Sequence, residues 1–191
     1  MPRAGLSPDA VVDAAVAVVD AGGPGALTLA AVAGRAGVAT PSLYKHVRNL
    51  AELRHLVTAR VLEELAGRLG EAALGRSGDD AVRALMYAYR SYVVEHPDRY
   101  GAMEQTSAQD DSTARDAAAE RILNILYGAL RGYALEGPEL VHAARCLRSA
   151  VHGFAVLEAA GGFGLPADLE ASYELLITMV IGGLAQGRHV A

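Results

Sequence analysis

The chain has 191 residues, of which 52% are hydrophobic and 20% are charged, and it carries a formal net charge of −5. This length accommodates one large domain or two smaller ones, and no apolar run reaches the roughly 18 residues that cross a bilayer. Because the N-terminus MPRAGLSPDA has no export signal and the single Cys146 excludes an internal disulfide and a cysteine-rich zinc site, we expect a cytoplasmic protein without membrane contact or cofactor.

Helical periodicity runs along almost the whole chain, without runs of alternating β-branched residues, and this predicts an all-α fold. The first helix is expected to begin after the N-cap Ser7, with Pro8 at its first position, and to stop at AGGPGA, residues 21–26. Thr28 is expected to cap a short second helix. Gly37 should end that helix, because glycine adopts the left-handed conformation at low cost.

Thr40 is expected to cap a third helix, in which Leu43 and Val47 face inward. Asn49 should cap the next helix, which is long. The helices from there on are expected at 49–74, at about 80–95, around Pro97, through 122–130, at about 138–160 and at about 168–186, with a loop at 107–113.

Residues 28–47, TLAAVAGRAGVATPSLYKHV, contain two short helices joined by a turn of three to four residues with a glycine. This is the layout of a helix-turn-helix motif, whose second helix enters the major groove of DNA. Residues 1–60 carry a net charge of +2 and the remainder −7, which is typical of a nucleic-acid contact confined to the N-terminal part. A generic helical hairpin is the alternative interpretation.

The segment LTLAAVAGRAGVATPSLYKHVRNLAEL closely resembles the signature of the TetR family of transcriptional repressors. Two positions depart from the family's usual pattern. Val47 stands where the family often has Phe, and Leu50 stands where it often has a lysine that contacts phosphate. Arg48 or Arg54 would then supply that charge.

The segment LRSAVHGFAVLEAAGGFGLP, residues 147–166, and the DLEASYELLI that follows are similar to the C-terminal domain of a TetR subgroup named for a Trp-His-Gly (WHG) triplet. Val151 replaces the Trp of that triplet, whereas His152 and Gly153 remain.

The resemblance implies a three-helix helix-turn-helix DNA-binding domain at residues 1–48 and a helical ligand-binding and dimerisation domain at 49–191, connected by the helix 49–74. It also implies a homodimeric repressor that binds a palindromic double-stranded DNA operator and is released by an unidentified small-molecule inducer. By analogy with the family, Tyr44 and His46 most often meet phosphates. The full set of expected DNA contacts is Thr28, Thr40, Pro41, Ser42, Tyr44, Lys45, His46 and Arg48.

Two further sets of residues are expected in the C-terminal part. Large or polar side chains that would line a ligand pocket are Met86, Tyr89, Tyr92, Met103, Tyr127 and His142, with ordinary core packing as the alternative. Small and apolar residues expected at the dimer interface are Ala150, His152, Gly153, Leu157, Leu175, Met179 and Gly182, with burial inside one subunit as the alternative.

We do not expect an enzyme, because the six histidines show no metal-ligand spacing and no glycine-rich phosphate loop follows a strand. A second alternative is a helical small-molecule-binding or partner-binding module without DNA binding. The net negative charge and the single lysine, Lys45, favour that alternative slightly.

Overall fold

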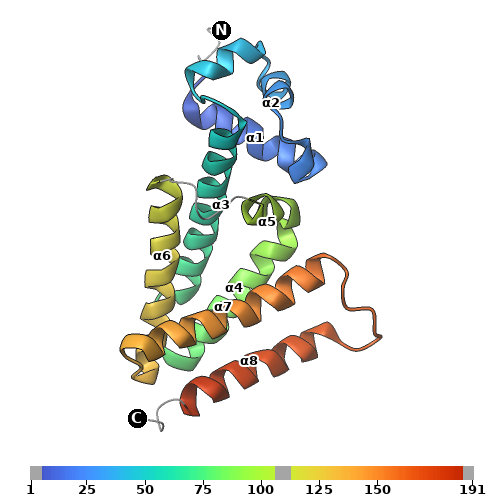
Figure 1. The fold of residues 1–191 in the computed structure, drawn as a ribbon. Helices are drawn as coiled ribbons and strands as arrows, with labels where there is room; N and C mark the ends of the chain where they lie inside the picture. The colour runs from blue at the N-terminus through green and yellow to red at the C-terminus, as the bar shows by residue number, and fades with distance from the viewer. Residues whose placement is uncertain (1–5, 106–112, 187–191) are drawn as a thin grey trace. The chain divides into compact units, whose positions relative to one another are not determined.

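The computed structural model describes residues 6–105 and 113–186, and within these ranges every regular element is a helix (Figure 1). The expected all-α fold is therefore confirmed. The loop expected at 107–113 lies outside the described residues, apart from Thr113. The chain forms two compact units, the first from Met1–Glu64 and Asp98–Ala118 and the second from Leu65–Pro97 and Ala119–Ala191.

The first unit contains α1 (Pro8–Gly22), η1 (Pro24–Ala26), α2 (Leu29–Ala36), η2 (Thr40–Lys45), the first part of α3 (Leu50–Ala73) and most of α5 (Pro97–Glu104). Helix α2 packs against both α1 and η2. Val11 of α1, Val32 of α2 and Leu43 of η2 have no exposed surface. The three N-terminal helices therefore share one apolar core, whose burial supplies most of their stability.

Side-chain caps fix where the N-terminal helices begin. The hydroxyl of Ser7 accepts a hydrogen bond from the backbone N–H of Ala10 at 3.1 Å. The hydroxyl of Thr28 does the same for Ala31, also at 3.1 Å, and the Asn49 side chain accepts from the N–H of Glu52 at 2.8 Å. These three predicted caps are confirmed.

The fourth predicted cap, Thr40, is wrong. Thr40 is the first residue of η2, a short 3₁₀ helix, and the residue before it, Ala39, is the N-cap. The helix starts one residue early because the N–H of Ser42 donates to the carbonyl oxygen of Ala39 at 2.8 Å, the i to i+3 bond of a 3₁₀ turn. No side chain caps this end.

Arg99 joins three helices of the first unit. Its guanidinium donates from Nε and Nη2 to the carboxylate of Asp20, at 2.7 Å in both bonds, and from Nη1 to Glu64 at 3.0 Å. Asp20 lies on α1, Glu64 on α3 and Arg99 on α5. This bidentate geometry is the stronger form of an arginine–carboxylate pair, so α5 is held against the end of α1.

The second unit contains the end of α3, α4 (Gly78–Glu95), most of α6 (Thr113–Leu130), η3 (Arg131–Tyr133), α7 (Gly137–Ala159) and α8 (Leu169–Gln186). Helices α7 and α8 run side by side as a hairpin, and both contact α4 (Figure 1). The core of this unit includes Met86, Leu147, Tyr173 and Ile177, each at most 1% exposed. The Tyr173 hydroxyl donates to the backbone carbonyl of Met86 at 2.5 Å, so its polar end is satisfied in the core.

Arg90 of α4 anchors the end of the α7–α8 hairpin at which the two helices are connected. It donates to Glu158 of α7 at 2.6 and 2.9 Å and to Glu170 of α8 at 2.6 Å. Its guanidinium also lies 4.5 Å from the centre of the Tyr173 ring. Since the Arg90 side chain is only 12% exposed, these contacts fix which side of α8 faces α4 and leave the opposite side outward. None of the described helices combines the length and apolar character that a bilayer span requires.

Candidate DNA-binding and ligand-binding sites

The N-terminus of α2 is a neutral helix end that faces solvent. Its cap is the hydroxyl of Thr28, which is exposed, and its first turn contains no acidic residue. Unpaired N–H groups and the helix dipole make such an end favourable for an anion. The position of Thr28 is therefore chemically suited to a DNA phosphate.

The turn between α2 and η2 depends on Gly37. Gly37 has φ 67° and ψ 31°, in the left-handed region, and its N–H donates to the carbonyl of Gly34 at 3.2 Å. The N–H of Val38 then donates to the carbonyl of Ala33 at 3.0 Å, which closes the end of α2. The chain leaves this turn in an extended conformation at Ala39 and enters η2 directly. The helix-turn-helix connection predicted around Gly37 is confirmed.

Helix η2 has one buried side and one exposed side. Leu43 is 0% exposed and Val47, just after the helix, is 2% exposed, as predicted for the residues that hold it to the core. Tyr44, in contrast, is 57% exposed. Of the other expected DNA contacts, Pro41, Lys45 and Arg48 are exposed, whereas Thr40, Ser42 and His46 are half-buried. The structure thus brings these residues together on one short element and the three residues that follow it.

The start of α3 differs from that of α2 because it carries its own anion. The Glu52 carboxylate accepts hydrogen bonds from the backbone N–H of Arg48 at 2.5 Å and from the Arg48 Nε at 3.1 Å. These bonds lower the pKa of Glu52 below its usual value, with the backbone bond as the largest cause, and they raise the pKa of Arg48. The positive charge of Arg48 is therefore already paired with a carboxylate in the absence of DNA.

The residues expected to line a ligand pocket lie in different environments. Met86, Tyr89 and Tyr92 of α4 are buried at 1%, 7% and 1% exposure. Met103 lies on α5 in the first unit and is 8% exposed. Of the remaining two, Tyr127 is half-buried and His142 is exposed.

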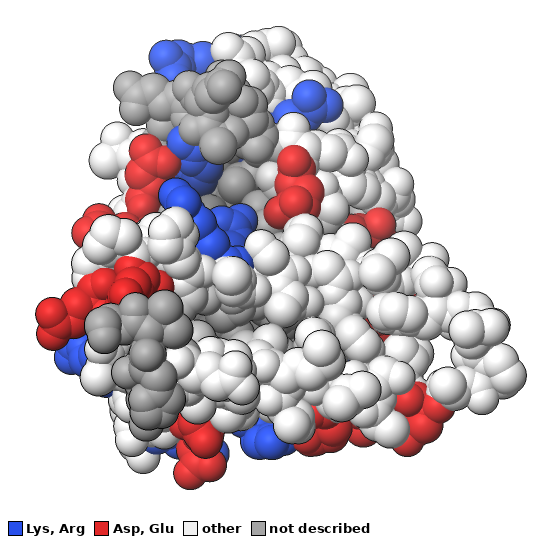
Figure 2. All heavy atoms as spheres, turned by 60° about the horizontal axis from the view of Figure 1, so that its bottom comes forward, with Lys and Arg blue, Asp and Glu red and all other residues white. Residues whose placement is uncertain are grey.

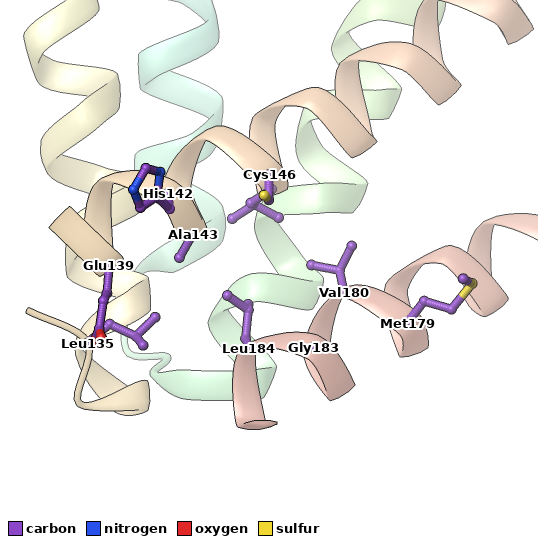
Figure 3. Close-up of a pocket in the computed structure, with 10 residues that line it drawn as sticks. Leu135, Glu139, His142, Ala143, Cys146, Met179, Val180, Gly183 and Leu184 are labelled. Atoms are coloured by element: carbon purple, nitrogen blue, oxygen red, sulfur yellow. The ribbon is translucent and has the colours of Figure 1, made fainter. Parts of the chain in front are cut away.

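One pocket of the second unit lies between α7 and α8 and has a volume of about 500 Å³ (Figure 3). Val180 and Leu184 point from α8 toward α7, and Ala143 points from α7 toward α8. His142 is the expected ligand residue that lines this pocket. The full lining is Leu135, Glu139, His142, Ala143, Cys146, Leu147, Met179, Val180, Gly183 and Leu184.

The outward side of α8 is opposite its buried side and carries no charged residue. Tyr173, Ile177 and Leu184 face the core, whereas Leu175 and Met179 are 61% and 65% exposed. At the spacing of an α-helix, the outward stripe consists of Ala171, Leu175, Thr178, Met179, Gly182 and Gln186. Figure 2 shows a broad uncharged surface over the α7–α8 hairpin, with acidic and basic side chains at its margin.

The expected interface residues of α7 border the same surface. Leu157 is 49% exposed, and Ala150, His152 and Gly153 are half-buried. Met179 belongs both to the expected interface and to the pocket lining. We refer to the outward stripe of α8, together with Gly153 and Leu157 of α7, as the hairpin face.

Sequence reasoning missed two features of these sites. The Arg48–Glu52 pair has the i, i+4 spacing of a helical ion pair and was detectable from the sequence. The pocket was not detectable from the sequence, because it depends on how α7 and α8 pack. Its residues Glu139, Val180 and Leu184 have no distinctive local pattern.

Comparisons with known proteins agree with this geometry. Residues 11–55 match the family model described as "Bacterial regulatory proteins, tetR family", and residues 82–180 match "Tetracyclin repressor-like, C-terminal domain". The HTH-type transcriptional regulator YobS of Bacillus subtilis is 33% identical over 96% of this chain and 95% of its own length. A second HTH-type transcriptional regulator, Rv0681 of Mycobacterium tuberculosis, is 37% identical over 82% of this chain and 72% of its own.

Solved structures share the fold. The transcriptional regulator SCO7222, a TetR from Streptomyces coelicolor, superposes with a TM-score of 0.77 at 23% identity, covering 96% of this chain and all of the other. The two family models cover both the helix-turn-helix and the helical C-terminal part, and the relatives are transcriptional regulators rather than enzymes by name. The chain therefore belongs to the TetR family of transcriptional regulators and carries that family's DNA-binding helix-turn-helix domain.

Proposed function

We propose that this protein is a repressor that binds a palindromic operator as a homodimer and is released from it by a small molecule. The observation that carries the proposal is the polar side of η2, which is exposed while Leu43 and Val47 hold the opposite side in the core. A rigidly held helix with exposed hydrogen-bonding groups is what recognition in the major groove requires. We divide the chain functionally at the start of α3, into residues 1–48 for DNA binding and 49–191 for dimerisation and ligand binding.

On DNA, the exposed residues fall into two roles. Thr28, Tyr44, His46 and Lys45 contact phosphates, which position the protein without reading sequence. The N-terminal part of η2, including Ser42, approaches base edges, where a good bidentate contact discriminates by roughly 1–3 kcal/mol. Thr40 and Pro41 start the helix, and Arg48 extends the phosphate contacts toward α3.

Dimerisation uses the hairpin face. The exposed Leu175 and Met179 and the absence of charge along the outward stripe of α8 support this role, since apolar area removed from water drives obligate association. Gly153 and Gly182 allow close approach of the partner's helices. The WHG subgroup shares His152 and Gly153 with this chain, and we assign the C-terminal domain to that subgroup on those residues.

The ligand binds within the second unit. His142 already lines a pocket of about 500 Å³, which is within the range of small-molecule sites. Met86, Tyr89 and Tyr92 are buried, so a ligand reaches them only if α4 moves relative to the hairpin. A ligand that favours such a conformation would shift the population away from the one that fits two successive major grooves.

Selection of bound sequences from random duplex DNA tests the proposal. Enrichment of a two-fold symmetric site is the expected result, because a symmetric dimer reads two half-sites. Compounds that raise the melting temperature of the protein are then tested for release of that DNA. Failure to bind duplex DNA in a salt-dependent way would favour the alternative, a helical ligand-binding or partner-binding module without DNA binding.

A further inference from the structure

We infer that Glu52 sets the DNA affinity of this protein by competing with phosphate for Arg48. The inference rests on the proposed DNA-binding function and concerns a residue outside the contact set described above. In this view Glu52 is a positioning residue. It touches no DNA itself, and it determines whether Arg48 is free to do so.

The contact geometry makes Glu52 a mimic of a bound phosphate. Two donors of Arg48, its backbone N–H and its Nε, converge on one carboxylate oxygen of Glu52, at 2.5 and 3.1 Å. Phosphate oxygens in DNA complexes accept hydrogen bonds from the same kinds of group, arginine side chains and backbone N–H groups. The carboxylate therefore occupies the position in which an anionic oxygen of DNA would be stabilised by Arg48.

The exposure of the two residues shows which one is free to exchange partners. The Arg48 side chain is 84% exposed and lies three residues after the end of η2, whereas the Glu52 side chain is 29% exposed. Arg48 is therefore accessible to DNA from solvent, while the less exposed Glu52 carboxylate pairs with it from the protein side. An exposed ion pair of this kind is weak enough to break when a stronger anion is available.

Comparison of the two helix starts in the first unit supports the same conclusion. At α2 the cap is the neutral hydroxyl of Thr28, and no acid lies in the first turn. At α3 the neutral cap Asn49 is followed by Glu52, whose charge lies in the first turn. Favourable interaction between a helix N-terminus and an anion is thus available to DNA at α2 and is already used by the chain at α3.

The consequence is an exchange, in which phosphate binding at Arg48 requires release of Glu52. Removing the carboxylate charge should therefore tighten binding to any DNA sequence, by about two- to fivefold, the range set by exposed ion pairs. The gain should be larger at low salt, because Arg48 would contact phosphate in a larger fraction of the complexes, and one full phosphate contact contributes about 0.9 to the log–log salt slope.

The experiment measures the Kd for a labelled duplex of random sequence over a series of NaCl concentrations. Glu52→Gln removes the charge but keeps an amide that can accept the same hydrogen bonds, so the start of α3 stays capped. The matched control is Glu71→Gln, the same change at an exposed position of α3, about five turns further along the helix. The second control is Glu52→Gln in an Arg48→Ala background.

The inference predicts that Glu52→Gln binds more tightly and with a steeper salt slope than both wild type and Glu71→Gln, and that this gain disappears when Arg48 is absent. Equal affinities of Glu52→Gln and Glu71→Gln would overturn it, and so would a gain that persists without Arg48. Wild-type protein that shows no salt-dependent binding would instead refute the proposed function, and this inference with it. The two failures are thus distinguishable.

Discussion

Helices η2 and α8 each bury one side and expose the other, but the two exposed sides differ in chemistry. On the side of η2 that faces the core, Leu43 is fully buried. On the side that faces solvent, Tyr44 is 57% exposed and its neighbour Lys45 is also exposed. On the side of α8 that faces the core, Tyr173 and Ile177 are fully buried, whereas on the side that faces solvent Met179 is 65% exposed. In both cases the opposite side is buried in the core. From the chemistry of the exposed sides we propose DNA as the partner of the polar groups of η2 and a second copy of the chain as the partner of the apolar groups of α8.

The largest effect is expected from a substitution that places a charged side chain on the hairpin face, which tests whether this face is the dimer interface. Met179→Asp would place a carboxylate without a partner at the centre of the proposed apolar interface, which costs several kcal/mol. We expect the variant to be monomeric by sedimentation equilibrium under conditions where wild type is dimeric. Asn124→Asp, which adds the same charge at an exposed position of α6, should leave the dimer intact. A dimeric Met179→Asp would show that the hairpin face is not the interface.

The second test separates the two sides of η2. Leu43→Ala removes a fully buried side chain, and large-to-small changes of this kind cost roughly 2–5 kcal/mol in stability. Tyr44→Ala, one residue later and exposed, should change stability by no more than about 0.5 kcal/mol. Denaturant unfolding measures both.

Both variants should also bind DNA more weakly than wild type, but for different reasons. Tyr44→Ala should bind more weakly although it is folded, because it lacks a phosphate contact. Leu43→Ala should bind weakly because η2 is no longer held in place, and an osmolyte that strengthens apolar burial should restore part of its affinity. Wild-type affinity in Tyr44→Ala would remove that residue from the DNA contacts.

How far the sequence predicted these features depends on the range of the interactions that determine them. The caps at Ser7, Thr28 and Asn49 were predictable because each involves a side chain and an N–H three residues away. Thr40 had the same local pattern, but a 3₁₀ turn closed by Ala39 took its place. Local preference was overridden there because η2 must reach the core with Leu43 within a few residues of the turn.

Local sequence patterns predicted neither the pocket nor the burial of the tyrosines of α4. Tyr89 and Tyr92 have the size and polarity of ligand-binding residues, and only the packing of α4 against neighbouring helices buries them, as where Arg68 of α3 lies 5.7 Å from the Tyr92 ring centre. Likewise, the α7–α8 pocket exists because these two helices present Ala143 and Leu184, residues that are far apart in the sequence, to each other. Periodicity predicts which side of a helix is apolar, but it does not predict which neighbour covers that side.

The third test concerns the single lysine. Lys45→Ala should weaken binding to operator and random DNA by a similar factor, because a phosphate contact carries no sequence information. The log–log salt slope should fall by about 0.9, the contribution of one phosphate. Arg131→Ala removes one positive charge at an exposed position of the second unit and should leave both quantities unchanged. A loss confined to the operator would instead identify Lys45 as a residue that reads a base.

The smallest expected effect is at Thr28, whose hydroxyl caps α2 and for which we propose a phosphate contact as well. Thr28→Ala removes the acceptor for the N–H of Ala31 and should cost about 1 kcal/mol in stability. Thr28→Ser keeps the hydroxyl and should restore most of that loss. Because the protein remains mostly folded after a loss of this size, any fall in DNA affinity measured for Thr28→Ala well below its unfolding midpoint reflects the α2 helix end itself. Unchanged affinity would mean that Thr28 caps α2 without contacting phosphate, and the proposed DNA-facing surface would then consist of η2, His46 and Arg48.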